Sequence, residues 1–100
     1  MFYIYILYAS KLNKFYVGQT ANLERRLFFH NRGKSKFTST GIPWTLIWVA
    51  TKTSRKDALI LERKLKNLTR KRKVRPMRKY KAGLINPTIL NQLFPINDEI

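Results

Sequence analysis

The sequence of 100 residues contains no cysteine. This absence excludes disulfide bonds, zinc sites built from thiolates, and thiol nucleophiles. Carboxylates are also scarce, because five Asp and Glu residues stand against 21 Lys and Arg residues and leave a formal net charge of +16. Such an excess of positive charge predicts a polyanionic partner, and nucleic acid is the first candidate.

Long hydrophobic runs are missing as well. No apolar stretch approaches the roughly 20 residues of a membrane span, and the basic stretches lack a long apolar helical face, so we expect no membrane partner and keep a membrane surface as a minor alternative. The apolar start lacks the basic segment of a signal peptide, which predicts a cytoplasmic protein. The length and the 44% share of hydrophobic residues suit one modest core. We expect one domain over residues 1–94 and a loose tail over residues 95–100.

The N-terminal segment has the composition of a β-hairpin. Phe2 to Ala9 is rich in Tyr and Ile, which favours a strand over a helix. Polar residues from Ser10 to Lys14 supply a turn, and Phe15 to Gly18 resumes the apolar pattern. Two antiparallel strands are therefore predicted within the first 18 residues.

The register of this hairpin decides which side chains share a face. If residues 9–14 form the connection, Leu7 lies opposite Tyr16. Tyr5 then lies opposite Gly18, which leaves a gap beside it, and the two tyrosines are diagonal neighbours about 7–8 Å apart at Cα. The pair could simply fill the sheet face. A phenol pKa of about 10 also makes each a weak base unless nearby cations lower it.

A short amphipathic helix is predicted to follow the hairpin. Asn22 can cap a helix from Leu23 to Asn31, and Gly33 is a stop signal just beyond it. At about 100° per residue, Arg26 and the only histidine, His30, fall on the leucine-bearing stripe. A charged pair on an inward edge is costly unless it has a partner or a ligand. A lone histidine, in contrast, is more often structural than catalytic.

The middle of the chain predicts a loop and a third strand. Residues 31–43 are rich in Gly, Ser, Thr and Lys, and Arg32, Lys34 and Lys36 make this a basic loop. The run from Trp44 to Ala50 then has the apolar character of a buried or half-buried strand.

Two further helices are predicted. Ser54 and Asp57 form a capping box that opens a helix through about Leu68. Asn86 and Pro87 can start a last short helix through Phe94, because proline suits the first helical turn.

Between Arg63 and Lys81 lie 11 of the 21 basic residues. A frayed, solvated helix end would explain them, but the charge of the whole chain favours a patch that follows a phosphate backbone. The residues that we expect to contact nucleic acid are Lys66, Arg70, Lys71, Arg72 and Lys73 here, with Arg32, Lys34 and Lys36 in the loop.

Glu62 is the carboxylate without a local explanation. Two of the five carboxylates lie in the predicted tail, Asp57 caps a helix, and Glu24 suits the positive end of its helix dipole. Glu62 can pair with Lys66 one turn later. Alternatively, it can hold a divalent cation through one carboxylate, with water and a substrate phosphate completing the shell.

Several short motifs then match a known family by their order and spacing. They are Tyr3-Ile4-Tyr5, Tyr16-Val17-Gly18, Asn22 to Leu27 with His30, Trp44, Ala58-Leu59 through Glu62 to Lys66, and Leu84 to Pro87 with Leu93. The chain resembles the GIY-YIG endonucleases, most closely their small stand-alone members with a URI-type domain. The resemblance covers roughly residues 1–94.

The resemblance implies an α/β fold of the α+β type, with a three-stranded antiparallel sheet flanked by helices in the order β-β-α-β-α plus a short C-terminal helix. It also implies cleavage of a DNA phosphodiester with one divalent metal, Mg²⁺ or Mn²⁺, and no small-molecule cofactor. Tyr5 and Tyr16 match the motif tyrosines, one of which helps to activate the attacking water. Arg26 matches the arginine that stabilises the transition state, His30 a residue that assists proton transfer, and Glu62 the metal ligand.

The chain departs from the family pattern at two positions. Tyr3 replaces the first glycine of the signature, and Gln19 stands where repair-type relatives carry a lysine. We expect no added DNA-binding domain and therefore low sequence specificity, with recognition of structure or single strands, and RNA stays open as a partner. The alternatives are a non-catalytic module that binds nucleic acid through the same fold and a structural protein associated with RNA.

Overall fold

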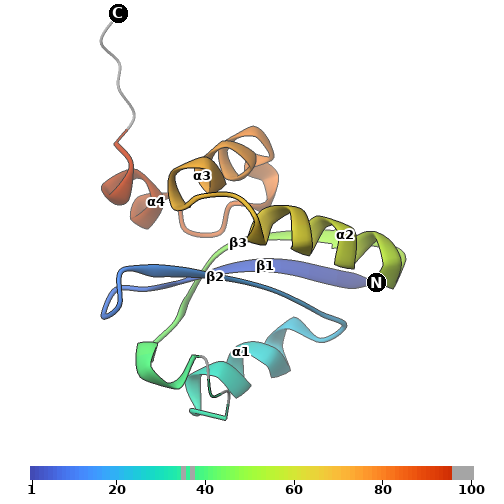
Figure 1. Cartoon of the computed structure of the whole chain (residues 1–100), viewed down its shortest axis with the longest axis horizontal. Helices are drawn as coiled ribbons and strands as arrows, with labels where there is room; N and C mark the ends of the chain where they lie inside the picture. Colours follow the sequence, from blue (N-terminus) through green and yellow to red (C-terminus); the bar gives the residue numbers. More distant parts are fainter. Residues whose placement is uncertain (35, 37, 96–100) are drawn as a thin grey trace, which may run out of the picture.

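The computed structural model describes residues 1–34, 36 and 38–95. It contains an antiparallel sheet with the strand order β2-β1-β3 and helices on both faces (Figure 1). The strands are β1 (Phe2–Ala9), β2 (Lys14–Thr20) and β3 (Thr45–Lys52), the α-helices are α1 (Leu23–Asn31), α2 (Arg55–Lys66), α3 (Arg70–Lys79) and α4 (Pro87–Leu93), and the 3₁₀ turns are η1 (Ser39–Gly41) and η2 (Lys81–Gly83). This architecture confirms the predicted fold class.

The predicted hairpin register is confirmed. In the pairing of β1 with β2, Leu7 lies opposite Tyr16 and Tyr5 lies opposite Gly18. The connection turns at Asn13, which has a positive φ of 52° and donates its backbone N–H to the carbonyl of Ser10 at 3.2 Å. Both tyrosines therefore project from the same face of the sheet.

Side-chain caps set where the predicted helices begin. The Asn22 side chain accepts a hydrogen bond from the backbone N–H of Arg25 at 3.0 Å, and Ser54 accepts one from Asp57 at 3.1 Å. Asn86 caps α4 in the same way. These bonds satisfy backbone donors that a helix leaves free at its first turn, so the cap residues predict the helix starts well.

The basic segment after α2 forms a helix that the sequence analysis did not predict. Helix α2 ends at Lys66, and Thr69 caps α3 by accepting from the backbone N–H of Arg72. Val74 and Met77 of α3 are buried in the core. Two apolar side chains three residues apart were enough to dock this helix, although basic residues surround them.

Alternation along β1 divides the core between the two faces of the sheet. Ile4 and Ile6 pack with residues of α2, α3 and α4, whereas Tyr5 and Leu7 pack with residues of α1 and with Trp44. In Figure 1, α1 lies on one face and α2 and α3 on the other. The predicted site residues Tyr5, Tyr16, Arg26 and His30 therefore belong to the α1 side, and Glu62 of α2 lies on the opposite side.

The third strand runs two residues further than predicted. β3 ends at Lys52 because Phe2 at the start of β1 pairs with it, and backbone pairing continues past the last apolar side chain. The predicted tail falls mostly on residues 96–100, which lie outside the described part of the chain. No helix within residues 1–34, 36 and 38–95 is long and apolar enough to cross a membrane.

Candidate active site

A buried chain of three polar side chains crosses the α1 side of the sheet. The hydroxyl of Tyr5 lies 2.9 Å from Nε2 of His30, and Nδ1 of the same ring lies 2.9 Å from Oγ1 of Thr38. All three residues are fully buried. A neutral imidazole donates through one nitrogen and accepts through the other, so one hydroxyl donates to the ring and the other accepts from it. This arrangement fixes the orientation of the His30 ring.

Tyr16 lies beside this chain but is more accessible. Its ring centroid is 6.4 Å from that of Tyr5 and 5.0 Å from that of His30, with the His30 ring edge-on. On its other side Trp44 packs at 6.1 Å, also edge-on. Tyr16 is only half-buried, whereas Tyr5 is fully buried, so Tyr16 is the tyrosine of the pair that solvent reaches.

Burial governs the protonation of the inner residues. It raises the pKa of Tyr5 to about 12, and the nearby Arg26 guanidinium opposes this rise, while the charges of Tyr16 and Glu62 add to it. Burial also lowers the pKa of His30, and the positive charge of Arg26 lowers it further. At neutral pH Tyr5 is therefore a neutral phenol and His30 a neutral imidazole.

Gly18 makes room for the buried tyrosine. A Cβ atom at Gly18 would lie 2.4 Å from the hydroxyl oxygen of Tyr5 and 2.5 Å from its Cζ. No side chain fits there while Tyr5 keeps its position, because real carbon atoms do not approach so closely. Gly18 in the second motif, Tyr16-Val17-Gly18, is thus required by the packing of Tyr5 in the first motif, Tyr3-Ile4-Tyr5.

Arg26 lies at the outer edge of the same cluster. It is half-buried, and its guanidinium carbon is 4.9 Å from the ring centroid of Phe29. Among the described residues, its buried Nε–H has no hydrogen-bond partner. Arg25, Arg26 and Phe29 also line a hollow of about 370 Å³ between α1 and the end of β2. A buried cationic donor beside an open hollow suits an anionic oxygen.

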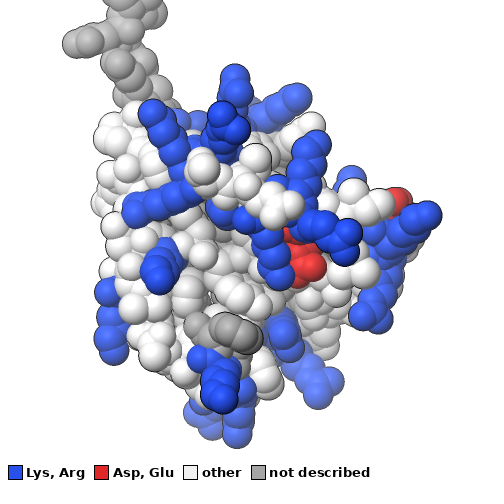
Figure 2. Space-filling view, viewed as in Figure 1, with Lys and Arg blue, Asp and Glu red and all other residues white. Residues whose placement is uncertain are grey.

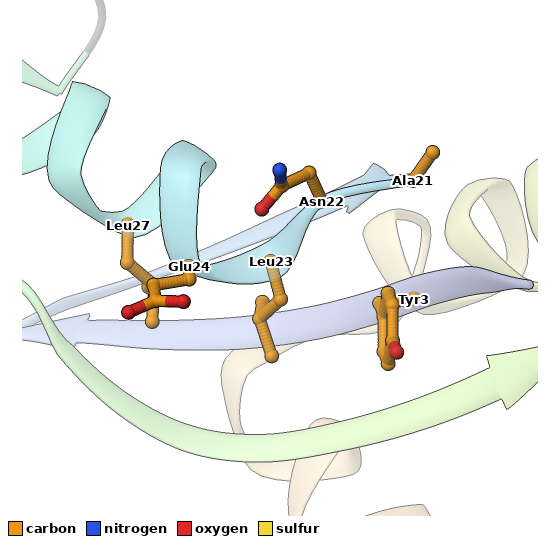
Figure 3. A pocket seen from close by; sticks show the side chains of 6 residues that line it. All are labelled: Tyr3, Ala21, Asn22, Leu23, Glu24 and Leu27. Atoms are coloured by element: carbon orange, nitrogen blue, oxygen red, sulfur yellow. The ribbon is translucent and has the colours of Figure 1, made fainter.

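A second hollow lies beside the first turn of α1 (Figure 3). Leu23 and Leu27 point from α1 toward the sheet, Tyr3 stands on β1, and the hollow measures about 430 Å³. It contains none of the predicted site residues and no basic side chain. Of the two hollows beside α1, it is the one between α1 and the end of β2 that a predicted site residue, Arg26, lines.

Glu62 approaches the site from the other side of the sheet. Helix α2 packs on β2 and β1, opposite α1, and the Glu62 side chain is 17% exposed. Its carboxylate pairs with Nζ of Lys66 at 3.4 Å. Because the Glu62 charge contributes to the raised pKa of Tyr5, the two residues are electrostatically coupled although they lie on opposite faces of the sheet.

The donor set limits which metal could bind. In the described part of the chain, no three His, Cys, Asp or Glu side chains are grouped to hold a metal ion. A single carboxylate suits Mg²⁺, which keeps several waters and is often completed by substrate phosphate. The residues therefore fit an ion that binds together with a phosphate, and they do not fit one held by protein side chains alone.

The predicted nucleic-acid contacts divide into exposed and engaged side chains. Arg32, Lys34, Lys36, Lys71 and Arg72 are exposed. In contrast, Arg70 donates to the side chain and the backbone carbonyl of Asn13, and Lys73 donates to the carbonyl of Leu68. Figure 2 shows Lys and Arg side chains over α2 and α3 and again near α1, with the few acidic atoms on α2 surrounded by basic ones.

Two residues of the site were not singled out in the sequence. Thr38 fixes His30, and its backbone carbonyl also accepts from Nε1 of Trp44 at 2.6 Å. Asn31 holds the backbone of Trp44 through both its side-chain oxygen and its nitrogen. Thr38 lies in a loop, and a loop has no sequence periodicity that marks a residue as part of a site. Only its position eight residues after His30 could have drawn attention to it.

These observations define a small, strongly basic α+β protein with a buried pair of tyrosine and histidine and a half-buried arginine. Residues 1–80 match the family model of the GIY-YIG catalytic domain. The chain therefore belongs to the GIY-YIG family.

Relatives of similar size support this assignment. The chain is 35% identical over 74 residues to the UPF0213 protein SH2523 of Staphylococcus haemolyticus, covering 73% of this chain and 89% of that protein. It is 34% identical over 86 residues to a UPF0213 protein of Pediococcus pentosaceus, covering 85% and 90%. The solution NMR structure of the UPF0213 protein BH0048 from Bacillus halodurans matches with a TM-score of 0.54 at 27% identity, over 97% of this chain and 100% of that one.

Proposed function

We propose that this protein is a metal-dependent endonuclease that hydrolyses DNA phosphodiester bonds with low sequence specificity. The observation that carries the proposal is the cluster of Tyr5, Tyr16, Arg26 and His30 in a chain of the GIY-YIG family. The formal charge of +16 supports a polyanionic substrate.

In this proposal the buried residues position the outer ones. Tyr5 and Thr38 orient the His30 ring, and the T-shaped contact of that ring supports Tyr16. Tyr16, which solvent reaches, then contacts the attacking water. Sequence pattern alone does not say which tyrosine does so, and burial favours Tyr16 because Tyr5 has no free access to substrate.

Arg26 stabilises the charge that develops on the phosphate. Its Nε–H is buried and has no partner among the described residues, and the hollow beside it is lined by a second arginine, Arg25. A donor that is already held in place costs no reorganisation when charge builds up, and this makes it effective.

Glu62, which now pairs with Lys66, would hold the divalent metal, Mg²⁺ or Mn²⁺. When bound, such an ion supplies Lewis acidity toward a phosphate oxygen. Helices α1 and α2 lie on opposite faces of the sheet, and the hollow that Arg26 lines is at the end of β2, so the scissile phosphate would lie at the β2 edge.

Exposed basic residues of the loop after α1 and of α3 hold the DNA backbone, and RNA stays open as a second substrate class. Phosphate contacts carry no sequence information, which accounts for the low specificity. Arg70 and Lys73 are bound within the protein and contribute mainly to folding.

The test compares Glu62→Gln with the wild-type protein on single-stranded, duplex and branched DNA. We expect the variant to lose Mg²⁺-dependent cleavage and to keep its DNA affinity in EDTA, because charge on the patch is retained. Lys56→Gln, on an exposed position of the same helix, is the matched control and should cleave normally. A wild-type protein that binds DNA but cuts none of these substrates with either metal would favour the non-catalytic binding module.

A further inference from the structure

A groove at the β3 edge of the sheet has no role in the proposed cleavage. It measures about 720 Å³ and lies where α2, the end of α3 and η2 meet the free edge of β3. Part of that edge is already covered, because Leu84 bridges Trp48 and the backbone N–H of Ile85 donates to the carbonyl of Ile47 at 2.7 Å. The groove follows the remaining edge, from Trp48 to Lys52.

Four lysines from four different elements line this groove. Lys52 comes from β3, Lys64 from α2, Lys79 from α3 and Lys81 from η2. All four are exposed, and no Asp or Glu side chain lines the groove. A concave surface with one sign of charge concentrates a ligand of the opposite sign, so the groove suits a polyanion.

An aromatic residue stands among these lysines. The Tyr80 side chain is 58% exposed, and Nζ of Lys79 lies 5.5 Å from its ring centroid. The backbone beneath it is fixed, since its N–H donates to Pro76 at 2.9 Å and its carbonyl accepts from Nε1 of Trp48 at 3.0 Å. An exposed ring on a rigid backbone is a stacking platform rather than a core residue.

The close fit of η2 against β3 holds the floor of the groove. A Cβ atom at Gly83 would lie 2.0 Å from the backbone carbonyl oxygen of Val49. The backbone of η2 therefore touches the strand directly, which leaves no room for a side chain between them. Apolar side chains such as Leu61 and Leu65 complete its lining.

We propose that this groove binds a single-stranded nucleic-acid segment, with the lysines contacting phosphates and Tyr80 stacking on a base. Basic residues that track a backbone and aromatic rings that stack on bases are the combination that single strands require. A duplex offers no unstacked base to Tyr80, and an acidic peptide gains nothing from the ring.

The groove is separate from the tyrosine side of the candidate active site, although α2, the helix of Glu62, lines it through Leu61, Lys64 and Leu65. It lies along β3, whereas Tyr16 and Gly18 belong to β2, and β1 runs between these two strands. A strand held in the groove would thus anchor one part of a nucleic acid while another part reaches the β2 edge. The binding itself does not depend on cleavage.

The test measures the anisotropy of a fluorescein-labelled 20-residue oligothymidylate on the full chain in EDTA. We expect Tyr80→Ala to weaken binding about 5- to 150-fold, as loss of one stacked base does, and Tyr80→Phe to bind as the wild type does. The triple variant K52Q/K79Q/K81Q should reduce the slope of log affinity against log salt by about 2. The triple variant K11Q/K14Q/K56Q removes the same charge from exposed positions elsewhere and controls for a general loss of charge.

Equal losses in the two triple variants, or an unchanged affinity in Tyr80→Ala, would overturn the proposal. The same would follow if Tyr80→Ala weakened a 20-base-pair duplex as much as the oligothymidylate, or if poly-glutamate competed as well as the oligonucleotide. Circular dichroism of each variant shows whether the fold is retained. Since no cleavage is measured, a failed nuclease assay and a failed groove are distinguishable results.

Discussion

The hydroxyl of Tyr5 lies 2.9 Å from Nε2 of His30, and neither side chain is exposed to solvent. The two residues come from the first strand and the first helix, 25 positions apart. Their contact joins α1 to the sheet and sets the position of the rings beside it.

Removing this hydroxyl should destabilise the protein. Tyr5→Phe leaves Nε2 of His30 buried without its partner, which costs ~1–3 kcal/mol. Urea unfolding followed by circular dichroism measures the loss. Tyr3→Phe, at a half-buried position of the same strand, is the control and should change stability little. Equal effects of the two substitutions would show that the hydrogen bond contributes nothing specific.

The stability of the protein should fall in mild acid. The pKa of His30 is lowered in the folded state by burial and by Arg26, so the unfolded chain takes up a proton first as the pH falls. The stabilisation is therefore complete above the unfolded value of about 6.5 and is lost progressively below it.

Unfolding measured between pH 7.5 and pH 5 tests this dependence. His30 is the only histidine, so His30→Gln should flatten the profile in that range although the variant is less stable overall. The ordinary pKa values of Asp and Glu side chains lie below this range, so these groups contribute little to the pH dependence of stability within it. A wild-type profile that is already flat would contradict the prediction.

Gly18→Ala should displace the buried tyrosine. The added Cβ would lie 2.4 Å from the Tyr5 hydroxyl, and overpacking of this kind costs ~1–3 kcal/mol. We expect a lower melting temperature and a shifted His30 ring resonance in NMR spectra. Thr20→Ala, two residues along the same strand, controls for a change of side chain on that face, and a shift of the same size there would argue against a specific clash.

Arg26→Lys should separate charge from hydrogen-bond geometry. A lysine keeps the positive charge but loses the planar set of donors, so we expect the cleavage rate to fall about 10²–10³-fold while affinity for DNA in EDTA is retained. Arg55→Lys, at an exposed position outside the candidate site, is the control. Unchanged cleavage by Arg26→Lys would remove Arg26 from the proposed mechanism.

Two adjacent basic residues of α3 should respond differently to truncation. Arg70→Ala loses hydrogen bonds to Asn13 and contacts with the rings of Phe15 and Phe94, so it should lower stability by ~1–2 kcal/mol. Lys71→Ala should leave stability unchanged and reduce the salt slope of DNA binding by about 1. Urea unfolding and salt-dependent anisotropy on both variants give the comparison, and a reversed pattern would contradict it.

Local pattern predicted much of the fold. The hairpin register followed from the extent of the turn, because a connection at residues 9–14 puts Leu7 opposite Tyr16 and Tyr5 opposite Gly18. The stripe on α1 placed Arg26 and His30 inward by helical periodicity, and His30 is indeed fully buried. Caps such as Asn22 fixed helix starts to the residue.

Contacts between distant parts of the chain could not be predicted in the same way from local sequence pattern. The partner of His30 in the loop, Thr38, depends on how residues 31–44 fold back, which no repeat encodes. Helix α3 was hidden because its two core residues lie among basic ones. The position of Glu62 on the opposite face from Arg26 depends on the placement of β3 beside β1, and the order of elements alone does not reveal it.

The central place of β1 also has a consequence for folding during synthesis. Tyr5 is made before β3, yet its strand pairs with β3 as well as β2, and the outermost pair joins Phe2 to Lys52. A nascent chain that has emerged only as far as α1 can form the hairpin but leaves one edge of β1 open. Long-range pairing of this kind slows folding, and an open apolar edge invites association with other chains. The sheet that the first half of the molecule begins is therefore complete only after β3 has been synthesised and has paired with β1.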